Sequence, residues 1–464
     1  MIVDISGHLL IITYKALEIA VKKINKTKPS LICFLTAVAL AGSIFASPVA
    51  SEEEPVYTID SSIKKLFTEG RPLINLRYRF EHVDDDLVPG NDAEASTLRV
   101  ALGWESGKVA GISFLAEMEH IAQLGPDNYR EGGFDLVNAG VFPIVADPPG
   151  TELNQAYARY TGIENLDIRI GRQDLTYRKA PFHRFIGNIL WRQNWQTYDA
   201  ARLSYKFSDK LKVEYAYLDQ VNRIFGDDAP GAASRFDCDC HLFNVQGKPF
   251  SFLNLEAYTY LLDIENAAAN SVDTFGIRGN GAYPFNDTFK VIYTGEYAHQ
   301  SDSDGNPVSY DADYFLGEGG IGVKVGQPWL KNLVFKFSHE VLEGNGTGSF
   351  ITPLSTAHAF QGWADRFLTT PVDGIEDSYF TAVGTGVFGG KVIVSYHMME
   401  SDNMSYDYGD EWNVLFARKF KKHFTLATKF AIYDADRNAT ALARAGGVQN
   451  NDVTKVWFWA QFNY

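Results

Sequence analysis

The chain has 464 residues, with 42 Lys and Arg against 57 Asp and Glu, so its formal net charge at pH 7 is −15. This acidic balance argues against a nucleic-acid-binding protein, because such proteins neutralise phosphates with an excess of basic side chains. Hydrophobic residues make up 45% of the chain and aromatic residues 14%, with 40 glycines. The composition excludes a protein built from many membrane-spanning helices and favours numerous β-strands.

The N-terminal region has the features of a secretory signal peptide. An apolar run at 31–46 ends in small residues and follows four lysines, Lys22, Lys23, Lys26 and Lys28. The run is shorter than the ~20 residues that a spanning helix needs, so a single N-terminal anchor is the weaker alternative. We expect a signal peptide at 1–46, a short periplasmic segment at 47–70 and one barrel domain at 71–464.

Beyond residue 70, apolar and polar residues alternate with a period of two, which is typical of β-strands. In the first such segment, Ile74 and Leu76 fall on one face and Asn75 and Arg77 on the other. Eighteen segments predict an all-β, antiparallel transmembrane barrel, with 16 strands as the alternative. The expected strands are 73–82, 95–104, 110–120, 153–161, 165–173, 197–207, 210–220, 241–248, 252–262, 272–281, 288–299, 313–325, 331–341, 377–388, 390–399, 410–420, 422–433 and 454–464.

The connections between these strands alternate in length. Long connections such as 121–152 and 342–376 are followed by tight ones such as 208–209 and 389. Outer-membrane barrels have long extracellular loops and short periplasmic turns, whereas a soluble β-sandwich has no such alternation. The pattern predicts a barrel in the bacterial outer membrane, in contact with its lipid and lipopolysaccharide.

The last expected strand has an aromatic residue at its end. Its outward row is Val456, Phe458, Ala460, Phe462 and Tyr464. This ending is similar to the C-terminal signature of outer-membrane barrels, which implies that the barrel assembly machinery is a partner and reads the strand through Tyr464.

Six stretches between about Arg71 and Asp228 resemble the alginate-export family of outer-membrane porins. They are LRYRFEHVDDD, DAEASTLRVALGW, VADPPGTELNQAYARY, IRIGRQDL, RFIGNILWRQNWQTYDAARL and YLDQVNRIFGDD. The resemblance implies a monomeric 18-stranded barrel whose Arg-rich constriction passes an anionic polysaccharide. Beyond residue 228 the chain matches the family only in its barrel patterning.

Inward arginines suit such a channel, because a guanidinium pairs with a carboxylate through two hydrogen bonds, and nearby acids keep binding weak enough for release. Arg172 and Arg192 belong to the GRQ and WRQN matches and are expected to shape a loop near the pore. In an alternative interpretation, the inward residues only form ion pairs in a wet lumen. The expected pore-lining or substrate-contacting residues are Arg77, Arg79, Arg99, Glu117, Glu119, Arg159, Arg169, Arg172, Arg192 and Arg202.

The expected function is therefore passive passage of an alginate-like polysaccharide or of other anionic solutes. The alternatives are a general or small-solute porin with no polysaccharide role, and a structural or adhesive barrel. An enzyme is not expected: no histidine lies in a nucleophile motif, and an open, water-filled lumen does not tune carboxylates such as Glu117 and Glu119. No cofactor is expected.

Two short motifs resemble metal sites only superficially. Asp84, Asp85 and Asp86 lack the spacing of a calcium loop and are expected to form a solvated acidic loop. Cys238 and Cys240 fall in the expected loop 221–240, where they form a local disulfide or remain thiols, since a zinc site needs more ligands than are present.

Overall fold

A computed structural model describes residues 59–303, 305–437 and 450–464. The chain divides into two units, Met1–Ile59 and Asp60–Tyr464, and the description below concerns the second. The predicted signal peptide and the first part of the predicted periplasmic segment lie outside the described residues, so these two predictions stay predictions.

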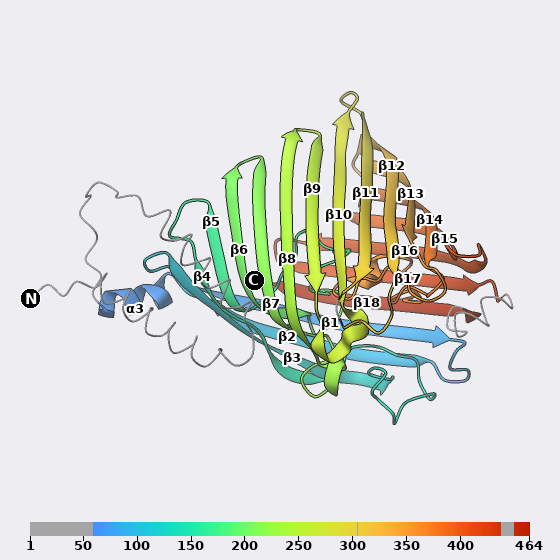
Figure 1. Cartoon of the computed structure of the whole chain (residues 1–464), viewed down its shortest axis with the longest axis horizontal. Coiled ribbons are helices and arrows are strands. Elements are labelled where there is room, and N and C mark those ends of the chain that lie inside the picture. Colours follow the sequence, from blue (N-terminus) through green and yellow to red (C-terminus); the bar gives the residue numbers. More distant parts are fainter. Residues whose placement is uncertain (1–58, 304, 438–449) are drawn as a thin grey trace, which may run out of the picture. The chain divides into compact units, whose positions relative to one another are not determined.

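Eighteen antiparallel strands of the described chain form one sheet that closes on itself (Figure 1). Consecutive strands are neighbours throughout, and β18 pairs with β1, with Phe458 opposite Phe80. Closure leaves no strand edge unpaired, as a lipid environment requires. The strands are β1 (Arg71–Asp85), β2 (Ala93–Glu105), β3 (Ile112–Asn128), β4 (Gly150–Tyr160), β5 (Leu166–Gln173), β6 (Thr197–Ser208), β7 (Leu211–Asn222), β8 (Arg235–Phe250), β9 (Leu253–Leu262), β10 (Val272–Pro284), β11 (Phe289–Asp302), β12 (Asp311–Gln327), β13 (Leu330–Leu342), β14 (Ile375–Val387), β15 (Gly390–Glu400), β16 (Asp407–Phe420), β17 (Phe424–Ala435) and β18 (Val453–Asn463).

The predicted all-β barrel is confirmed, with 18 strands rather than 16. One predicted boundary is wrong in a way that matters: β8 begins at Arg235, not at residue 241. Cys238 and Cys240 therefore lie in a strand and not in a surface loop. They continue the inward row that contains Leu242, and all three side chains are buried. A free cysteine can occupy such a position because it packs as a small hydrophobic residue.

The two faces of the barrel wall differ as the alternation predicted. On β18, Trp457 is completely buried on the inward face, while the outward Phe458 is 44% exposed. On β1, Arg77 and Arg79 are buried on the inward face. Exposed apolar side chains on the outside are the arrangement expected in lipid, where hydrocarbon replaces water.

Exposed aromatic side chains gather at the end of the barrel that carries the short turns. This is the position of the aromatic girdle at a membrane interface, where a ring contacts both lipid and water. The apolar wall and the girdle identify a barrel that spans the bacterial outer membrane. The aromatic residues are Trp104, Phe207, Tyr283, Phe285, Trp329, Phe388, Phe424 and Tyr464.

Helices are few and short in the described part. The helix α3 (Ile59–Thr68) precedes β1, and three 3-10 helices lie in long connections: η1 (Gly231–Ala233), η2 (Glu265–Asn270) and η3 (Ala357–Ala359). Among the described residues, no helix has the length and apolar character needed to cross a membrane.

Two long connections, 174–196 and 343–374, fold against the inner wall and supply much of the core. The ring of Phe185 lies 5.0 Å from that of Tyr258 and 5.5 Å from that of Tyr314, both on the wall, and 6.0 Å from that of Phe350 in the other connection. The hydrophobic core of this protein is thus inside the barrel, and the two connections, here called the inner loops, occupy part of the lumen.

Candidate functional site

The inner loop 174–196 lies on the wall formed by β1 and β2. Arg77 donates through Nε to Gln193 Oε1 (2.8 Å) and through Nη1 to the carbonyl of Leu190 (2.6 Å). Gln193 in turn donates to Thr97 Oγ1 on β2 (2.9 Å). Arg79 donates to the carbonyl of Trp191. The two wall arginines therefore satisfy loop carbonyls that water would otherwise have to reach.

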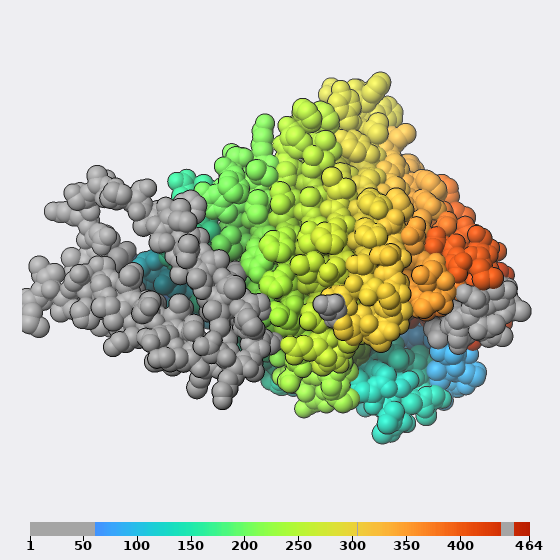
Figure 2. All heavy atoms as spheres, in the orientation of Figure 1, coloured from blue at the N-terminus to red at the C-terminus, as the bar shows by residue number. Residues whose placement is uncertain are grey.

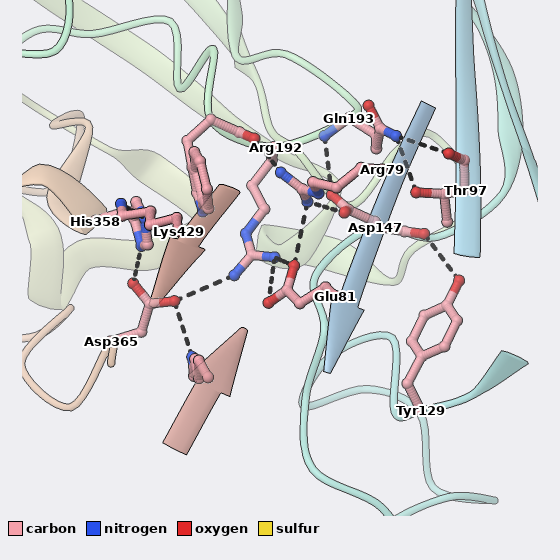
Figure 3. A network of polar contacts seen from close by, with 12 residues as sticks. Arg79, Glu81, Thr97, Tyr129, Asp147, Arg192, Gln193, His358, Asp365 and Lys429 are labelled. Atoms are coloured by element: carbon pink, nitrogen blue, oxygen red, sulfur yellow. Dashed lines mark hydrogen bonds and ion pairs between the residues drawn. The ribbon is translucent and has the colours of Figure 1, made fainter. Parts of the chain in front are cut away.

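A third connection, 129–149, contributes Asp147 to the same place (Figure 3). Its carboxylate pairs with Arg79 and accepts a hydrogen bond from the backbone N–H of Gln193 (2.9 Å), while its carbonyl accepts one from Tyr129 (3.0 Å). Burial alone would raise the pKa of Asp147, but Arg79 and Arg192 outweigh it and hold the pKa below its ordinary value. The carboxylate is thus ionised and fixes three segments to one another.

Arg192 links the two inner loops. Its guanidinium lies 3.1 Å from Glu81 on β1 and 3.3 Å from Asp365 in the connection 343–374. Asp365 also pairs with Lys455 of β18 at 2.9 Å and with His358 at 2.5 Å. Figure 3 shows Arg192 between the two carboxylates. Because every charge in this chain of contacts is buried and paired, it serves as a structural clamp.

Lys429 of β17 lies at the end of the same network. Its Nζ is 2.6 Å from Nε2 of His358 and lies over the rings of Trp363 (3.7 Å) and Trp191 (4.3 Å). The His358 ring stacks on Trp191 at 4.1 Å. An ammonium against Nε2 requires a neutral imidazole that donates through Nδ1 to Asp365, and burial accordingly holds the pKa of His358 well below its ordinary value.

The predicted site residues of β2 and β3 face inward but lie beneath the loop. Arg99 is fully buried, with its guanidinium 3.8 Å from the Trp195 ring centre and 2.6 Å from Glu119. Glu119 also accepts from the N–H of Trp195 (3.4 Å). Glu117 accepts from Gln155 (3.4 Å). These three charged groups are buried beneath the loop and paired with protein groups.

The remaining predicted arginines are also paired. Asp167 binds Arg159 at 2.7 Å and Arg169 at 3.5 Å on the inward side of β4 and β5. Arg202 of β6 pairs with Glu214 of β7. Arg172 lies three residues beyond Arg169, so strand alternation turns it to the other face, where it pairs with Asp199 at 2.8 Å.

Two further arginines of the inner loop 174–196 pair with glutamates on the opposite wall. Arg178 pairs with Glu256 of β9 (2.9 Å) and Glu296 of β11 (2.5 Å), and Arg184 pairs with Glu340 of β13 (3.1 Å). The loop 174–196 is thus clamped to both sides of the lumen. These buried ion pairs hold the loop against the wall, because breaking one would leave a buried charge without a partner.

Beside this clamp the lumen holds a cavity of about 1270 Å³, which reaches from the inner loops to the short turns. Its lining contains thirteen Lys and Arg and four Asp and Glu, although the chain as a whole is acidic. Among the described residues, five of its lysines are exposed and form no ion pair. Lys179 belongs to the inner loop 174–196, and we call the other four, on the wall and its short turns, the vestibule lysines. They are Lys206, Lys210, Lys248 and Lys391.

Sequence reasoning selected Arg77 and Arg79, which line this cavity, but missed the vestibule lysines. A signal for one of them was present, because Lys206 lies four residues after Arg202 and so shares its face of β6. The vestibule lysines lie in the short turns or within three residues of them, whereas the predicted Arg77 and Arg79 lie in the middle of β1.

A closed barrel with an apolar outside, a charged interior and folded inner loops belongs to the class of outer-membrane porin folds. Solved structures of that class are similar to the whole barrel. OccAB2 of Acinetobacter baumannii is 17% identical with a TM-score of 0.62, and the match covers 85% of this chain and 98% of that one. OpdQ of Pseudomonas aeruginosa is 13% identical with a TM-score of 0.60, over 86% and 99%. OpdK of the same organism is 11% identical with a TM-score of 0.62, over 85% and 98%.

No family model matches the chain, and no curated protein sequence matches it. The structural likeness supports the predicted outer-membrane porin class, and at these identities it is a likeness of fold. It gives no support to the alginate-export family in particular.

Proposed function

We propose that this protein is a passive channel for small anionic solutes, in particular carboxylates. The observation that carries the proposal is the excess of thirteen basic over four acidic side chains around the lumenal cavity. Local charge of this kind decides which ion enters, because loop acids more than about 8–10 Å away are screened at physiological salt. A narrow, low-dielectric passage strengthens the effect of the groups that line it.

The vestibule lysines are the groups best placed to contact a solute. They are exposed in the cavity and form no ion pair with a described residue, so an arriving carboxylate finds unneutralised ammonium groups. Lysine is also suited to weak, transient contact, since its ammonium group lacks the planar pair of N–H donors with which a guanidinium binds both oxygens of a carboxylate. Arg77 and Arg79 line the inner end of the cavity, but their donors are engaged by the inner loop.

The inner loops favour small solutes over a polysaccharide. Both loops lie within the lumen and are clamped by buried ion pairs, so a continuous wide path for a polymer would require these pairs to break. A cavity of about 1270 Å³ suits molecules of the size that ligand pockets generally hold. The similar structure of OpdK was solved with vanillate, an aromatic carboxylate, which agrees with the chemistry proposed here.

Swelling of liposomes that contain the purified barrel tests the proposal. A set of isosteric solutes, one carboxylate, one neutral and one cationic, compares charge at constant size. We expect the carboxylate to enter fastest, and we expect the triple variant Lys206→Gln, Lys248→Gln, Lys391→Gln to lose this preference. Lys422→Gln, an exposed lysine in the turn between β16 and β17 that does not line the cavity, is the matched control. Equal entry of all three solutes into wild-type liposomes would contradict the proposal.

A further inference from the structure

We propose that α3 is a membrane-surface helix that inserts Ile63 and Phe67 into the phospholipid leaflet at the turn end of the barrel. The helix has one apolar face: Ile63, Leu66 and Phe67 follow one another at spacings of three and one and so lie side by side. Ile63 is 51% exposed and Phe67 65%, whereas Leu66 is half-buried. Two large apolar side chains one turn apart therefore point away from the protein.

The structure fixes α3 at the level of the aromatic girdle. The carbonyl of Leu66 accepts a hydrogen bond from the N–H of Gly107 in the turn between β2 and β3 (2.9 Å). Gly70, which joins α3 to β1, lies so close to the outward Trp104 that a Cβ on it would be 2.6 Å from the ring. Because Trp104 belongs to the girdle, the helix begins its contact with the barrel where the membrane surface lies.

The charges around this face fit anionic headgroups. Lys64 and Lys65 on α3 are exposed, and so is Lys108 in the turn next to Leu66. Basic residues beside a short apolar face are typical of helices that lie in the interfacial plane. The exposed apolar area consists of two side chains, which is little for a stable protein interface and sufficient for shallow insertion into lipid. We therefore infer that the apolar face of α3 contacts an anionic bilayer surface and not a second protein.

Spin-label accessibility tests the inference in the full-length protein purified from outer membranes, with Cys33→Ser, Cys238→Ala and Cys240→Ala as background. Labels are placed at Ile63→Cys and Phe67→Cys on the apolar face, and at Lys64→Cys and Thr68→Cys on the polar side of the helix as controls. Heat-modifiable mobility on unboiled gels verifies that each labelled barrel is folded. The barrels are placed in nanodiscs that contain phosphatidylglycerol.

We expect oxygen, which concentrates in lipid, to reach the labels at 63 and 67 better than a water-soluble nickel chelate does, and the reverse at 64 and 68. Preference for nickel at all four positions would overturn the inference, because the helix would then lie in water. Labels at 63 and 67 that are shielded from both reagents would overturn it as well, since protein would then cover the face.

The role of charge is tested separately. The double variant Lys64→Glu, Lys65→Glu is expected to lower the oxygen-to-nickel accessibility ratio at position 67 in phosphatidylglycerol nanodiscs but not in purely zwitterionic ones. An unchanged ratio in both lipids would overturn the claim that anionic headgroups hold the helix. None of these outcomes depends on whether the barrel conducts anions.

Discussion

The interior of the barrel contains two cationic regions that differ in one respect. Under the inner loop, Arg79, Arg99 and Arg192 are buried and paired with carboxylates or loop carbonyls. Toward the short turns, lysines such as Lys206 and Lys391 are exposed and form no ion pair with a described residue. The first region holds the structure together, and the second presents charge to the water in the lumen.

The comparison teaches that an inward cation is not by itself a solute-binding group. A buried pair has already lost its water, and its charge is largely cancelled by its partner. An exposed ammonium retains its field and its capacity to bind. Substitutions in the two regions should therefore have different effects. Those under the loop should change stability and loop position, and those of the vestibule lysines should change ion selectivity.

The largest effect is expected for Arg79→Gln. The substitution removes the cation that pairs directly with the buried Asp147, which typically costs about 3–5 kcal/mol, while Glu81 keeps its pair with Arg192. Because the strand pairing is intact, we expect the barrel to persist and the loop 186–196 to detach. Hydrogen exchange over this loop measures the effect, and unchanged protection would show that Arg79 does not hold it.

A smaller effect is expected from acid. The pKa of His358 lies well below its ordinary value mainly because the ring is buried, with Lys429 adding to the shift against Asp365. Once the loop opens, this histidine regains a pKa of about 6.5, so below that pH the open state binds a proton that the closed state does not. The closed loop should thus lose stability as the pH falls from 7 to 5.

Hydrogen exchange over residues 356–366 at pH 7.4 and pH 5.0, corrected for intrinsic exchange rates, measures this loss. The variant His358→Gln cannot take up the proton and is the control, because its protection should depend on pH less than that of the wild type. Equal protection of the wild type at both pH values would contradict the assignment of a neutral His358.

The smallest effect is expected for Arg172→Gln. Its pair with Asp199 lies on the face of β5 opposite to Arg169, at the end of the strand that joins the long connection 174–196. The pair is partly exposed there, so solvent weakens the attraction. The free energy of unfolding should fall by less than about 1 kcal/mol, and ion selectivity should not change. A marked change in selectivity would place Arg172 in the conduction path and would invalidate the assignment of faces.

The sequence predicted the barrel well because period-two alternation is a local signal. The inward placement of Arg77 and Glu119 and the outward placement of Phe458 each follow from neighbouring residues alone. The error at Cys238 was also local: the predicted strand began six residues too late, although Asp237 and Asp239 occupy the other face of β8 and so continue its alternation.

Which charged residues are buried and paired could not be predicted in the same way. Trp195 covers Arg99 and Arg192 reaches Glu81 because a loop of more than twenty residues folds back into the lumen. Such contacts join residues about one hundred positions apart, and the loop has no periodic pattern from which they could be predicted. The expected monomeric state and the partners lipopolysaccharide and barrel assembly machinery likewise stay predictions.

The central claim is that the vestibule lysines make the lumen select anions. The reversal potential of single channels in a planar bilayer under a KCl gradient tests it most directly. We predict chloride preference for the wild type, and a decrease of about twofold in the permeability ratio for each of Lys206→Gln, Lys248→Gln and Lys391→Gln, as expected for a unit charge ~10 Å from the ion path once screening by salt is included. Cation preference in the wild type, or a ratio that these substitutions leave unchanged, would contradict the claim.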